Sequence, residues 1–315
     1  MTYKLIHQNC LDAMKEMENE SIDLMVTSPP YYNAREYSQW EDFDAYYQDM
    51  KQIFKEVYRL TKSHKNIVVN VGNVIGRTNK APSSRQTIPL GAHFIIMLEA
   101  IGFTFQEDFI WFKGEVQSKR NFAGRPYPYQ KHPINCYEHI LVFTKKPKET
   151  KHLSCPKCGN EKTYKKGFSS GAPTFECRNK SCKKPSNKGY YTFSKKSQLR
   201  ERYEKPENEI DKETLRLWRK DVAHFPTTMN HRKTKHNKNG HTAPFPETIP
   251  EMAIKFYSGV GDIVLDIFSG SGTTGVVALK LNRNYIGTEI HKEYVELSKE
   301  RLDATMKQLA ESEGV

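Results

Sequence analysis

A short apolar run that ends in two consecutive prolines constrains this chain most. Ile22 to Val26 has the composition of a buried strand, and Thr27-Ser28-Pro29-Pro30-Tyr31 follows it directly. Neither proline can donate a ladder hydrogen bond and each fixes its own φ, so the strand must leave its sheet there in a stiff turn. Ser28 and the Pro29 carbonyl offer acceptors and Tyr31 offers a ring face, which together suit a planar amine. A plain strand exit with a tyrosine packed over it is the alternative.

A glycine-rich turn near residue 270 gives the second constraint. Asp262 to Asp266 has the pattern of a buried strand, and Phe268-Ser269-Gly270-Ser271-Gly272-Thr273 leads from it into an apolar helix. Tyr285 to Glu289 predicts the next strand, with the Glu289 carboxylate at its end, where it can accept from ribose hydroxyls. The spacing departs from the dinucleotide fingerprint. The pattern therefore predicts a nucleoside-containing cofactor on an α/β fold.

Together the two motifs resemble those of the amino-methylating DNA methyltransferases. In that family S-adenosyl-L-methionine binds at an F-x-G-x-G turn, and a (D/N/S)-P-P-(Y/F/W) loop holds the target amine. Two further segments are similar to family motifs: Asn135 to Phe143 resembles the H/Y-E-x-I-L-V-F strand, and His241 to Glu247 resembles H-x-A-P-F-P-E. The resemblance covers most of the chain. The order of the motifs, with the proline loop before the cofactor turn, resembles the permuted β-group.

The resemblance implies a permuted class I S-adenosylmethionine-dependent methyltransferase, a doubly wound α/β sheet with an inserted zinc-ribbon target-recognition region. We expect residues 1–147 to form the catalytic half, 148–240 the insert and 241–315 the cofactor-binding half. Tyr3 to His7 then supplies the third strand of the sheet, which the permutation moves to the start of the chain. With 315 residues, 37% of them apolar, one large domain with an insert is favoured over two equal domains.

The resemblance also implies the site residues. The catalytic residues are those of the proline loop, Ser28, Pro29, Pro30 and Tyr31. The cofactor-binding residues lie at strand ends and in the glycine turn: Asn9, Thr27, Asp266, Phe268, Gly270, Gly272, Thr273 and Glu289. Asn9 stands where the family usually carries Asp near the adenine, and an N-cap for the following helix is an equal alternative. Asp266 is expected either near the methionine ammonium or capping backbone amides.

An exocyclic base amine is a poor nucleophile because its lone pair is delocalised into the ring. Hydrogen bonds from the amine to Ser28 and to the Pro29 carbonyl would localise that lone pair for in-line attack on the methyl sulfonium. Tyr31 would stack on the base. Carbon-5 methylation needs a thiolate nucleophile, and no cysteine here follows a proline as in the Pro-Cys motif. A base inside a duplex must be flipped out to reach such a loop.

The predicted activity is site-specific DNA methylation at cytosine N4. In the resembled family Ser before the two prolines is commoner among cytosine-N4 enzymes and Asp among adenine-N6 enzymes, so Thr27-Ser28 favours N4, with adenine N6 as the alternative. A non-catalytic zinc-dependent DNA-binding module and an RNA-methylating relative are the rival functions. The sequence leaves open the recognition site, a monomer or dimer, and a cognate restriction endonuclease as partner.

Four cysteines form the best-defined metal signature. Cys155 and Cys158 are separated by two residues, and after eighteen more residues Cys177 and Cys182 are separated by four. Four thiolates at two knuckles suit tetrahedral zinc, and they leave no open position for water, so the zinc is expected to be structural. A disulfide is disfavoured by the expected cytoplasmic context.

The basic charge of the chain belongs to the predicted insert. Residues 144–240 hold 26 Lys and Arg against 10 Asp and Glu, a formal charge of +16, whereas the rest holds 23 against 27, or −4. This division favours binding of double-stranded DNA by the insert, although lysine-rich surfaces also serve solubility. Lys183 to Asn239 alternates basic and aromatic residues and is expected to recognise the target, with a solvated linker as the alternative for Arg232 to Gly240.

The sequence predicts a cytoplasmic protein with no membrane partner. No stretch of about 18 uncharged apolar residues occurs. Met1 to Asn9 also lacks the basic-then-apolar pattern of a signal peptide.

Overall fold

The computed structural model describes residues 1–34, 39–77, 85–114, 136–146, 153–169, 172–183, 189–194, 208–225 and 246–313. They form two compact units. The larger unit combines Met1–Lys146 with Ile210–Val315, and the smaller unit is Pro147–Glu209. None of the helices in the described ranges combines the length and apolarity that a membrane crossing needs.

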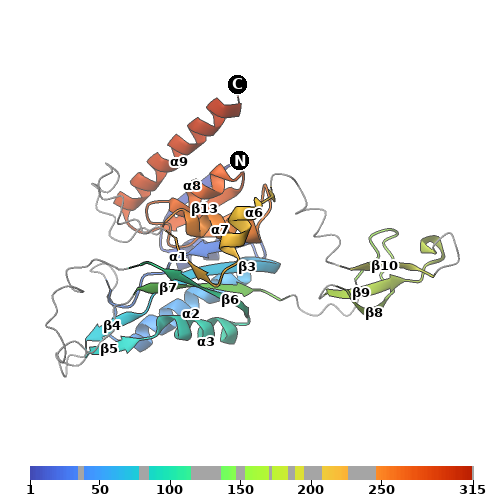
Figure 1. Ribbon diagram of the computed structural model, residues 1–315, viewed down its shortest axis with the longest axis horizontal. Helices are drawn as coiled ribbons and strands as arrows, with labels where there is room; N and C mark the ends of the chain where they lie inside the picture. Colours follow the sequence, from blue (N-terminus) through green and yellow to red (C-terminus); the bar gives the residue numbers. More distant parts are fainter. Residues whose placement is uncertain are drawn as a thin grey trace. The chain divides into compact units, whose positions relative to one another are not determined.

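The larger unit is built on one eight-stranded sheet, in the order β1-β13-β12-β2-β3-β7-β6-β11 (Figure 1). Its strands are β1 (Tyr3–His7), β2 (Ile22–Thr27), β3 (Thr61–Val71), β6 (Thr104–Phe112), β7 (Tyr137–Thr144), β11 (Val222–Ala223), β12 (Ile263–Asp266) and β13 (Asn284–Glu289). Strand β7 pairs antiparallel with β3 and β6, and the other neighbouring pairs are parallel. The predicted doubly wound α/β sheet is confirmed.

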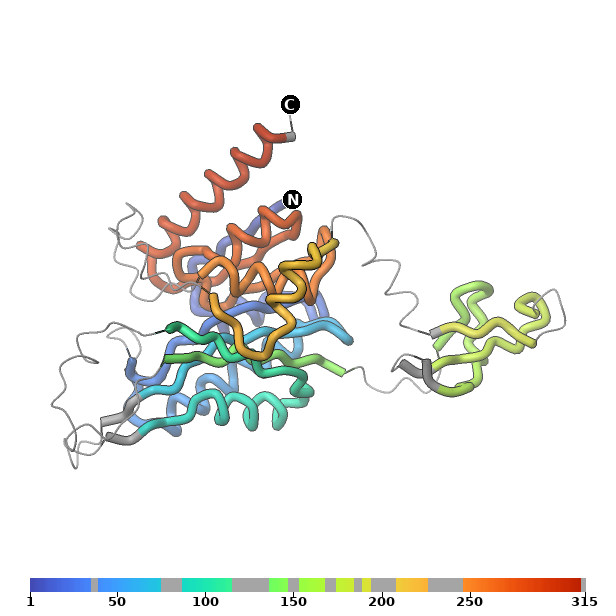
Figure 2. The backbone as a smooth tube through the Cα atoms, viewed as in Figure 1, coloured from blue at the N-terminus to red at the C-terminus, as the bar shows by residue number. Residues whose placement is uncertain are grey.

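Strands from the two ends of the chain alternate in this sheet. His7 of β1 pairs with Glu289 of β13, and Leu24 of β2 pairs with Val264 of β12. Figure 2 shows the blue amino-terminal segment lying among the orange and red carboxyl-terminal elements. The permuted arrangement, in which the amino-terminal strand lies beside the carboxyl-terminal strands, is therefore confirmed.

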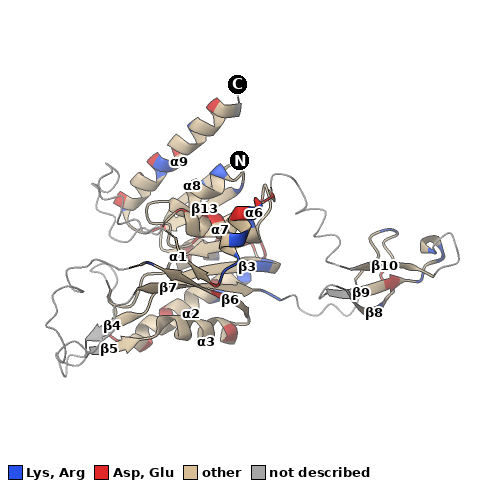
Figure 3. Cartoon of the chain, viewed as in Figure 1, with Lys and Arg blue, Asp and Glu red and all other residues tan. Residues whose placement is uncertain are grey.

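The segment that follows the smaller unit belongs to the larger one. Trp218 at the end of α6 (Lys212–Trp218) is 6% exposed and packs edge-on against Phe256, and β11 extends the sheet beside β6. Basic and acidic side chains alternate along the exposed part of α6 (Figure 3). The sequence predicts an insert that reaches residue 240, whereas the smaller unit ends at Glu209, because Trp218 anchors the chain to the larger core.

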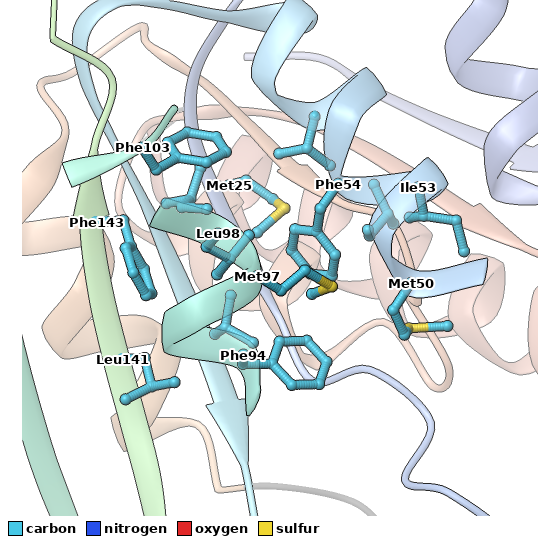
Figure 4. Packing of buried hydrophobic residues seen from close by; sticks show 14 of the residues in the cluster. Met25, Met50, Ile53, Phe54, Phe94, Met97, Leu98, Phe103, Leu141 and Phe143 are labelled. Atoms are coloured by element: carbon cyan, nitrogen blue, oxygen red, sulfur yellow. The ribbon is translucent and has the colours of Figure 1, made fainter. Parts of the chain in front are cut away.

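Helices cover both faces of the sheet. One face packs against α1 (Cys10–Lys15), α2 (Phe43–Leu60) and α3 (Leu90–Ile101), and Figure 4 shows Phe54 and Phe94 of these helices beside Met25 and Phe143 of the strands. The other face packs against α6, α7 (Thr248–Tyr257), α8 (Thr273–Lys280) and α9 (Lys292–Glu313). Successive strand residues belong to opposite faces, as the period of two requires.

Most predicted elements agree closely with the structure, and one region differs. Apolar and aromatic residues recur at helical spacing from residue 43 to 60, which predicts a helix, and this segment forms α2. An apolar segment from residue 88 predicts a helix stopped by Gly102, and Gly102, with φ of 121°, ends α3. Residues 72–77 have the composition of a turn, but β4 (Val74–Arg77) pairs antiparallel with β5 (Arg85–Ile88). The pairing places Val74 against the core beside Ile88, which explains the difference. The rest of the loop expected from residue 78 lies outside the described residues.

The smaller unit is a three-stranded antiparallel sheet, β8 (Thr163–Ser169), β9 (Ala172–Cys177) and β10 (Tyr191–Ser194), with one short 3-10 helix, η1 (Lys180–Cys182). Its described buried cluster consists of three cysteines and two phenylalanines, Cys155, Cys177, Cys182, Phe175 and Phe193. A core of this size supplies little hydrophobic stabilisation, so such a unit needs a cross-link or a metal.

Candidate functional site

The predicted cofactor residues come together at one edge of the sheet. Parallel strands end at the same edge, and Asn9, Glu289, Asp266 and Thr27 follow or end β1, β13, β12 and β2 respectively. From β12 the chain proceeds through α8 to β13 on one side, and from β2 through α2 to β3 on the other. This is a topological switch point, where open α/β sheets bind their ligands.

Asp266 and Thr27 are in direct contact across the switch point. Thr27 Oγ1 donates to Asp266 Oδ1 over 2.7 Å, and the Phe268 amide donates to the same oxygen over 3.1 Å. Asp266 is 1% exposed and Thr27 is fully buried. Burial raises the pKa of Asp266 to about 6, although the bonds from Thr27 and Phe268 oppose this shift. Of the two expected roles of Asp266, the geometry shows capping of a backbone amide.

The glycine turn adopts a conformation that other residues disfavour. Gly270 and Gly272 have φ of 51° and 76°, in the left-handed region. A Cβ on Gly272 would clash with Ser298 Oγ and lie 3.3 Å from the Ser298 Cα, so the turn lies directly against α9. Thr273 is then the first residue of α8, and the turn presents its backbone at the amino end of that helix.

Arg301 of α9 donates several hydrogen bonds to the glycine turn. Its Nη1 donates to the Ser271 carbonyl over 2.6 Å, to Ser271 Oγ over 3.1 Å and to Thr273 Oγ1 over 3.3 Å. Glu247, the last residue of the predicted H-T-A-P-F-P-E segment, lies 3.7 Å from Arg301 and 3.0 Å from Lys280. Arg301 could not be predicted from the sequence, because a single arginine in a polar helix carries no local signal.

The Glu289 carboxylate is fixed beside the turn. Its Oε2 accepts from the Gly270 amide over 2.9 Å, and its Oε1 accepts from the Ile290 and His291 amides over 2.9 and 2.8 Å. A carboxylate oxygen can accept two hydrogen bonds, so Oε2 retains capacity for a ribose hydroxyl.

Asn9 lies two residues after His7, the partner of Glu289 in the sheet, and it caps a helix. Its Oδ1 accepts from the Leu11 amide over 2.9 Å, at the amino end of α1. The capping alternative is therefore the geometry observed, and an adenine contact by Asn9 remains a proposal.

Contacts with α2 and with the core hold the proline loop in place. Tyr46 of α2 donates to the Pro30 carbonyl over 3.1 Å, and Pro29 is buried. Tyr31 packs against the core, and its hydroxyl donates to Glu138 Oε2 over 2.9 Å. Burial, followed by the negative charge of Glu138, raises the pKa of Tyr31 well above its usual value. Tyr31 is therefore a stable hydrogen-bond donor.

Glu138 connects the proline loop to Lys113, which no sequence motif indicates. Lys113 Nζ, one residue beyond β6, pairs with Glu138 Oε1 and lies 4.8 Å from the centroid of the Trp111 ring. Glu138 lies at the start of β7, which runs opposite to β3 and so begins at the edge where β3 ends. The pairing of Glu138 with Lys113 and Tyr31 could not be predicted from the sequence, because Glu138 lies within an apolar strand motif.

The four predicted metal ligands lie together in the smaller unit. Their sulfur atoms are all within 4.8 Å of one another, and the Cys155–Cys182 and Cys158–Cys177 sulfur pairs are 3.8 and 3.7 Å apart. Tetrahedral zinc with Zn–S bonds of about 2.3 Å requires sulfur separations of about 3.8 Å. Amide groups of Asn160 and Asn179 lie 3.7 and 3.6 Å from Cys177 and Cys158 sulfurs, as expected of donors to thiolates. The positions of the four cysteines therefore fit a tetrahedral zinc ion.

Comparison with known proteins gives consistent results. A family described as DNA methylase matches residues 22–300. The Type II beta methyltransferase M.BslI of Bacillus sp. (strain NEB-606) is 32% identical over 303 residues, which cover 95% of this chain and 27% of that protein. The Type II methyltransferase M.HpaI of Haemophilus parainfluenzae is 26% identical over 310 residues, which cover 96% and 75%. This chain thus spans about a quarter of the length of the first relative and three quarters of the second.

Solved structures share the fold. A Thermus thermophilus protein described as a DNA modification methylase, complexed with S-adenosyl-L-methionine, has a TM-score of 0.64 at 22% identity, covering 96% of this chain and 94% of that one. The cytosine-N4-specific PvuII DNA methyltransferase has a TM-score of 0.62 at 20% identity, covering 96% and 86%.

Proposed function

Because the chain belongs to the N6/N4 DNA methylase family, we propose that it transfers a methyl group from S-adenosyl-L-methionine to an amino group of DNA. The observation that carries this proposal is the Thr27–Asp266 contact, which ties the proline loop to the glycine turn at one switch point. A non-catalytic DNA-binding module does not require the proline loop and the glycine turn to lie together. Calorimetric titration with the cofactor separates the two, because only the enzyme is expected to bind it.

We assign one set of residues to the cofactor and another to the target base. The cofactor supplies an electrophilic methyl group when it is bound. Glu289 would accept a hydrogen bond from the ribose, and Asp266, Phe268, Gly270, Gly272 and Thr273 would hold the rest of the cofactor. Ser28 and the Pro29 carbonyl would accept hydrogen bonds from the two amine N–H groups, and the Tyr31 ring would stack on the flipped base. Buried Pro29 and the Tyr46 bond to Pro30 support this role, because they restrict movement of the acceptors.

We assign the methylated atom as cytosine N4. The Ser28 hydroxyl before the prolines supports the assignment. Adenine N6 is the second candidate, since a serine can accept from either amine. Mass spectrometry of nucleosides from methylated duplex DNA is the test. N4-methylcytosine is expected, N6-methyladenine alone would reverse the assignment, and full activity of Ser28→Ala would refute the proposed chemistry.

We further propose that Cys155, Cys158, Cys177 and Cys182 bind one structural zinc ion. The sulfur separations and the small buried cluster of this unit support the proposal. The unit also presents exposed Tyr164 with Arg178 stacked 4.3 Å from its ring centroid, a pairing that suits contact with nucleic acid. Elemental analysis of the purified protein should give one zinc per chain.

The relatives suggest a partner. M.BslI and M.HpaI are Type II methyltransferases, and we propose that this chain likewise modifies the site that a cognate restriction endonuclease cleaves. Protection of methylated DNA from one sequence-specific endonuclease would test this. Within the chain, we assign amine binding to residues 1–147 and cofactor binding to residues 241–315 together with Thr27 and Asn9.

A further inference from the structure

We propose that Arg178 reads a guanine in the major groove of duplex DNA, and that Tyr164 and Glu176 hold its guanidinium in the direction that this contact requires. The inference deepens the proposed DNA methylation, because it names a residue that selects the target sequence. It concerns only the smaller unit, Pro147–Glu209, which holds 16 Lys and Arg against 7 Asp and Glu, a formal charge of +9. Such a charge suits a polyanionic partner.

One face of the small sheet carries polar side chains across all three strands (Figure 1). Tyr164 of β8 lies opposite Glu176 of β9, and Thr192 of β10 lies opposite Glu176 on the other side. Phe175, the neighbour of Glu176, belongs to the buried cluster. Because successive residues of a strand point to opposite faces, the three polar side chains share the face away from that cluster.

Arg178, one residue beyond β9, is held by two contacts with this face. Its Nε donates to Glu176 Oε1 over 3.1 Å, and its guanidinium carbon lies 4.3 Å from the centroid of the Tyr164 ring. The Glu176 side chain is 10% exposed, so water competes weakly for this bond, whereas the Arg178 side chain is 57% exposed. Within the residues that the structure describes, Nε is the only nitrogen of Arg178 that donates. Its two terminal nitrogens therefore stay available to a ligand.

The terminal nitrogens of Arg178 match the major-groove edge of guanine. Guanine presents O6 and N7 there as neighbouring acceptors, and an arginine that donates to both makes the commonest base-specific contact. An arginine that is already fixed by a carboxylate and a ring loses less side-chain entropy when it binds. The major groove is about 12 Å wide and admits a two-stranded β-ribbon, such as the one that β8 and β9 form.

The place of Glu176 argues against a surface that attracts phosphates by charge alone. Its Oε2 lies 2.6 Å from Lys166 Nζ, so this one carboxylate faces two basic side chains. A negative charge at this position weakens the attraction of both cations for phosphate. Its presence is explained if it directs the guanidinium of Arg178 toward a base.

The test is selection of binding sequences from a pool of random duplexes by the full chain, followed by affinity measurements on the enriched duplex. The wild type should enrich a sequence with a G·C pair whose replacement by A·T weakens binding about 5- to 150-fold, the range for a bidentate contact. Arg178→Lys keeps the charge but loses the planar fork, so discrimination at this pair should fall to about twofold or less. Discrimination at other positions and the salt dependence should be unchanged, because no phosphate contact is lost.

Variants of the two neighbours test whether they position Arg178. Tyr164→Ala and Glu176→Gln should each lower discrimination at the same pair, and Glu176→Gln should also strengthen binding to unrelated duplexes, because a negative charge is removed. Adding Tyr164→Ala to Arg178→Lys should cause little further loss, since both act through one contact. Tyr164→Phe keeps the ring and is the matched control. Lys162→Ala, which removes an exposed charge of the same unit, should leave discrimination intact.

Each outcome decides between the alternatives. A wild type that enriches no sequence would overturn the inference, as would an Arg178→Lys variant that enriches the same sequence as the wild type. An equal loss of affinity for every duplex would make Arg178 a phosphate contact and would also overturn it. A protein that enriches a sequence but methylates no DNA would refute the proposed function, while the same variants still decide whether Arg178 reads a base.

Discussion

Thr27 and Asp266 are 239 residues apart in the sequence, yet their side chains share a 2.7 Å hydrogen bond inside the sheet. The proline loop continues directly from Thr27, and the glycine turn begins two residues after Asp266. Because each motif leaves its strand at this bond, the position of one motif is fixed relative to the other without a contact between the loops themselves.

The pH dependence of stability should report the buried Asp266 carboxyl. Its pKa is raised from 3.8 to about 6 by burial, so the folded protein binds this proton more tightly than the unfolded chain does. Stability should therefore decrease as pH rises from about 4 to about 6, by up to about 3 kcal/mol relative to Asp266→Asn, and then remain level. Urea unfolding of both proteins across this range is the measurement. An equal pH dependence in the two proteins would show that Asp266 is not the responsible group.

Two glycines with similar φ should differ sharply in their tolerance of alanine. Gly272 and Gly261 have φ of 76° and 81°, but only at Gly272 would a Cβ meet neighbouring atoms, those of Ser298. We expect Gly261→Ala to cost about 1–2 kcal/mol for the left-handed backbone alone. Gly272→Ala should cost more and should also weaken cofactor binding, as measured by calorimetry. Equal effects on stability and cofactor affinity would contradict the close packing of the turn on α9.

The opposite edge of the sheet should contribute to stability without affecting the site. Lys65 Nζ lies 2.8 Å from Asp262 and 3.1 Å from Asp23, and all three side chains are at most 8% exposed. Lys65→Met should cost about 3–5 kcal/mol, because it leaves two buried carboxylates without this partner. Exposed Lys15, paired with Asp12, is the control, and Lys15→Met should change stability by less than about 0.5 kcal/mol. Cofactor affinity of folded Lys65→Met should match the wild type.

Loss of the cysteine cluster should separate DNA binding from cofactor binding. Cys155→Ser combined with Cys158→Ser should release zinc and weaken DNA binding, while cofactor affinity is retained, because the glycine turn belongs to the other unit. The salt dependence should also become shallower, by about 0.9 in slope for each phosphate that the variant no longer neutralises. Cys136→Ser, outside the cluster, is the control. Unchanged DNA affinity and specificity in the zinc-free protein would refute a recognition role for the smaller unit.

The sequence predicted the parts of the fold that local pattern determines. Apolar runs predicted the strands and placed the two motifs at strand ends, whereas the order of the sheet followed from the resemblance to the permuted family. The sheet edge then brings Thr27, Asp266 and Glu289 together. Arg301 and Glu138 could not be found in this way, because each acts on a segment distant in sequence. Trp218 lies within the segment from Lys183 to Asn239 that the sequence assigns to target recognition, yet it is buried and packs against Phe256, a contact that no local pattern predicts.

The sheet order also has a consequence for the sequence of folding events. β2, β3, β6 and β7 can pair once residue 144 has been synthesised, whereas β1 is separated from β2 by two positions that only β12 and β13 fill. That gap stays open until residue 289 has left the ribosome. Closing it is a non-local step of the kind that slows folding, since the loop entropy must be lost before the new contacts form. A nascent chain therefore carries the proline loop long before β12, the strand that leads into the glycine turn, is available.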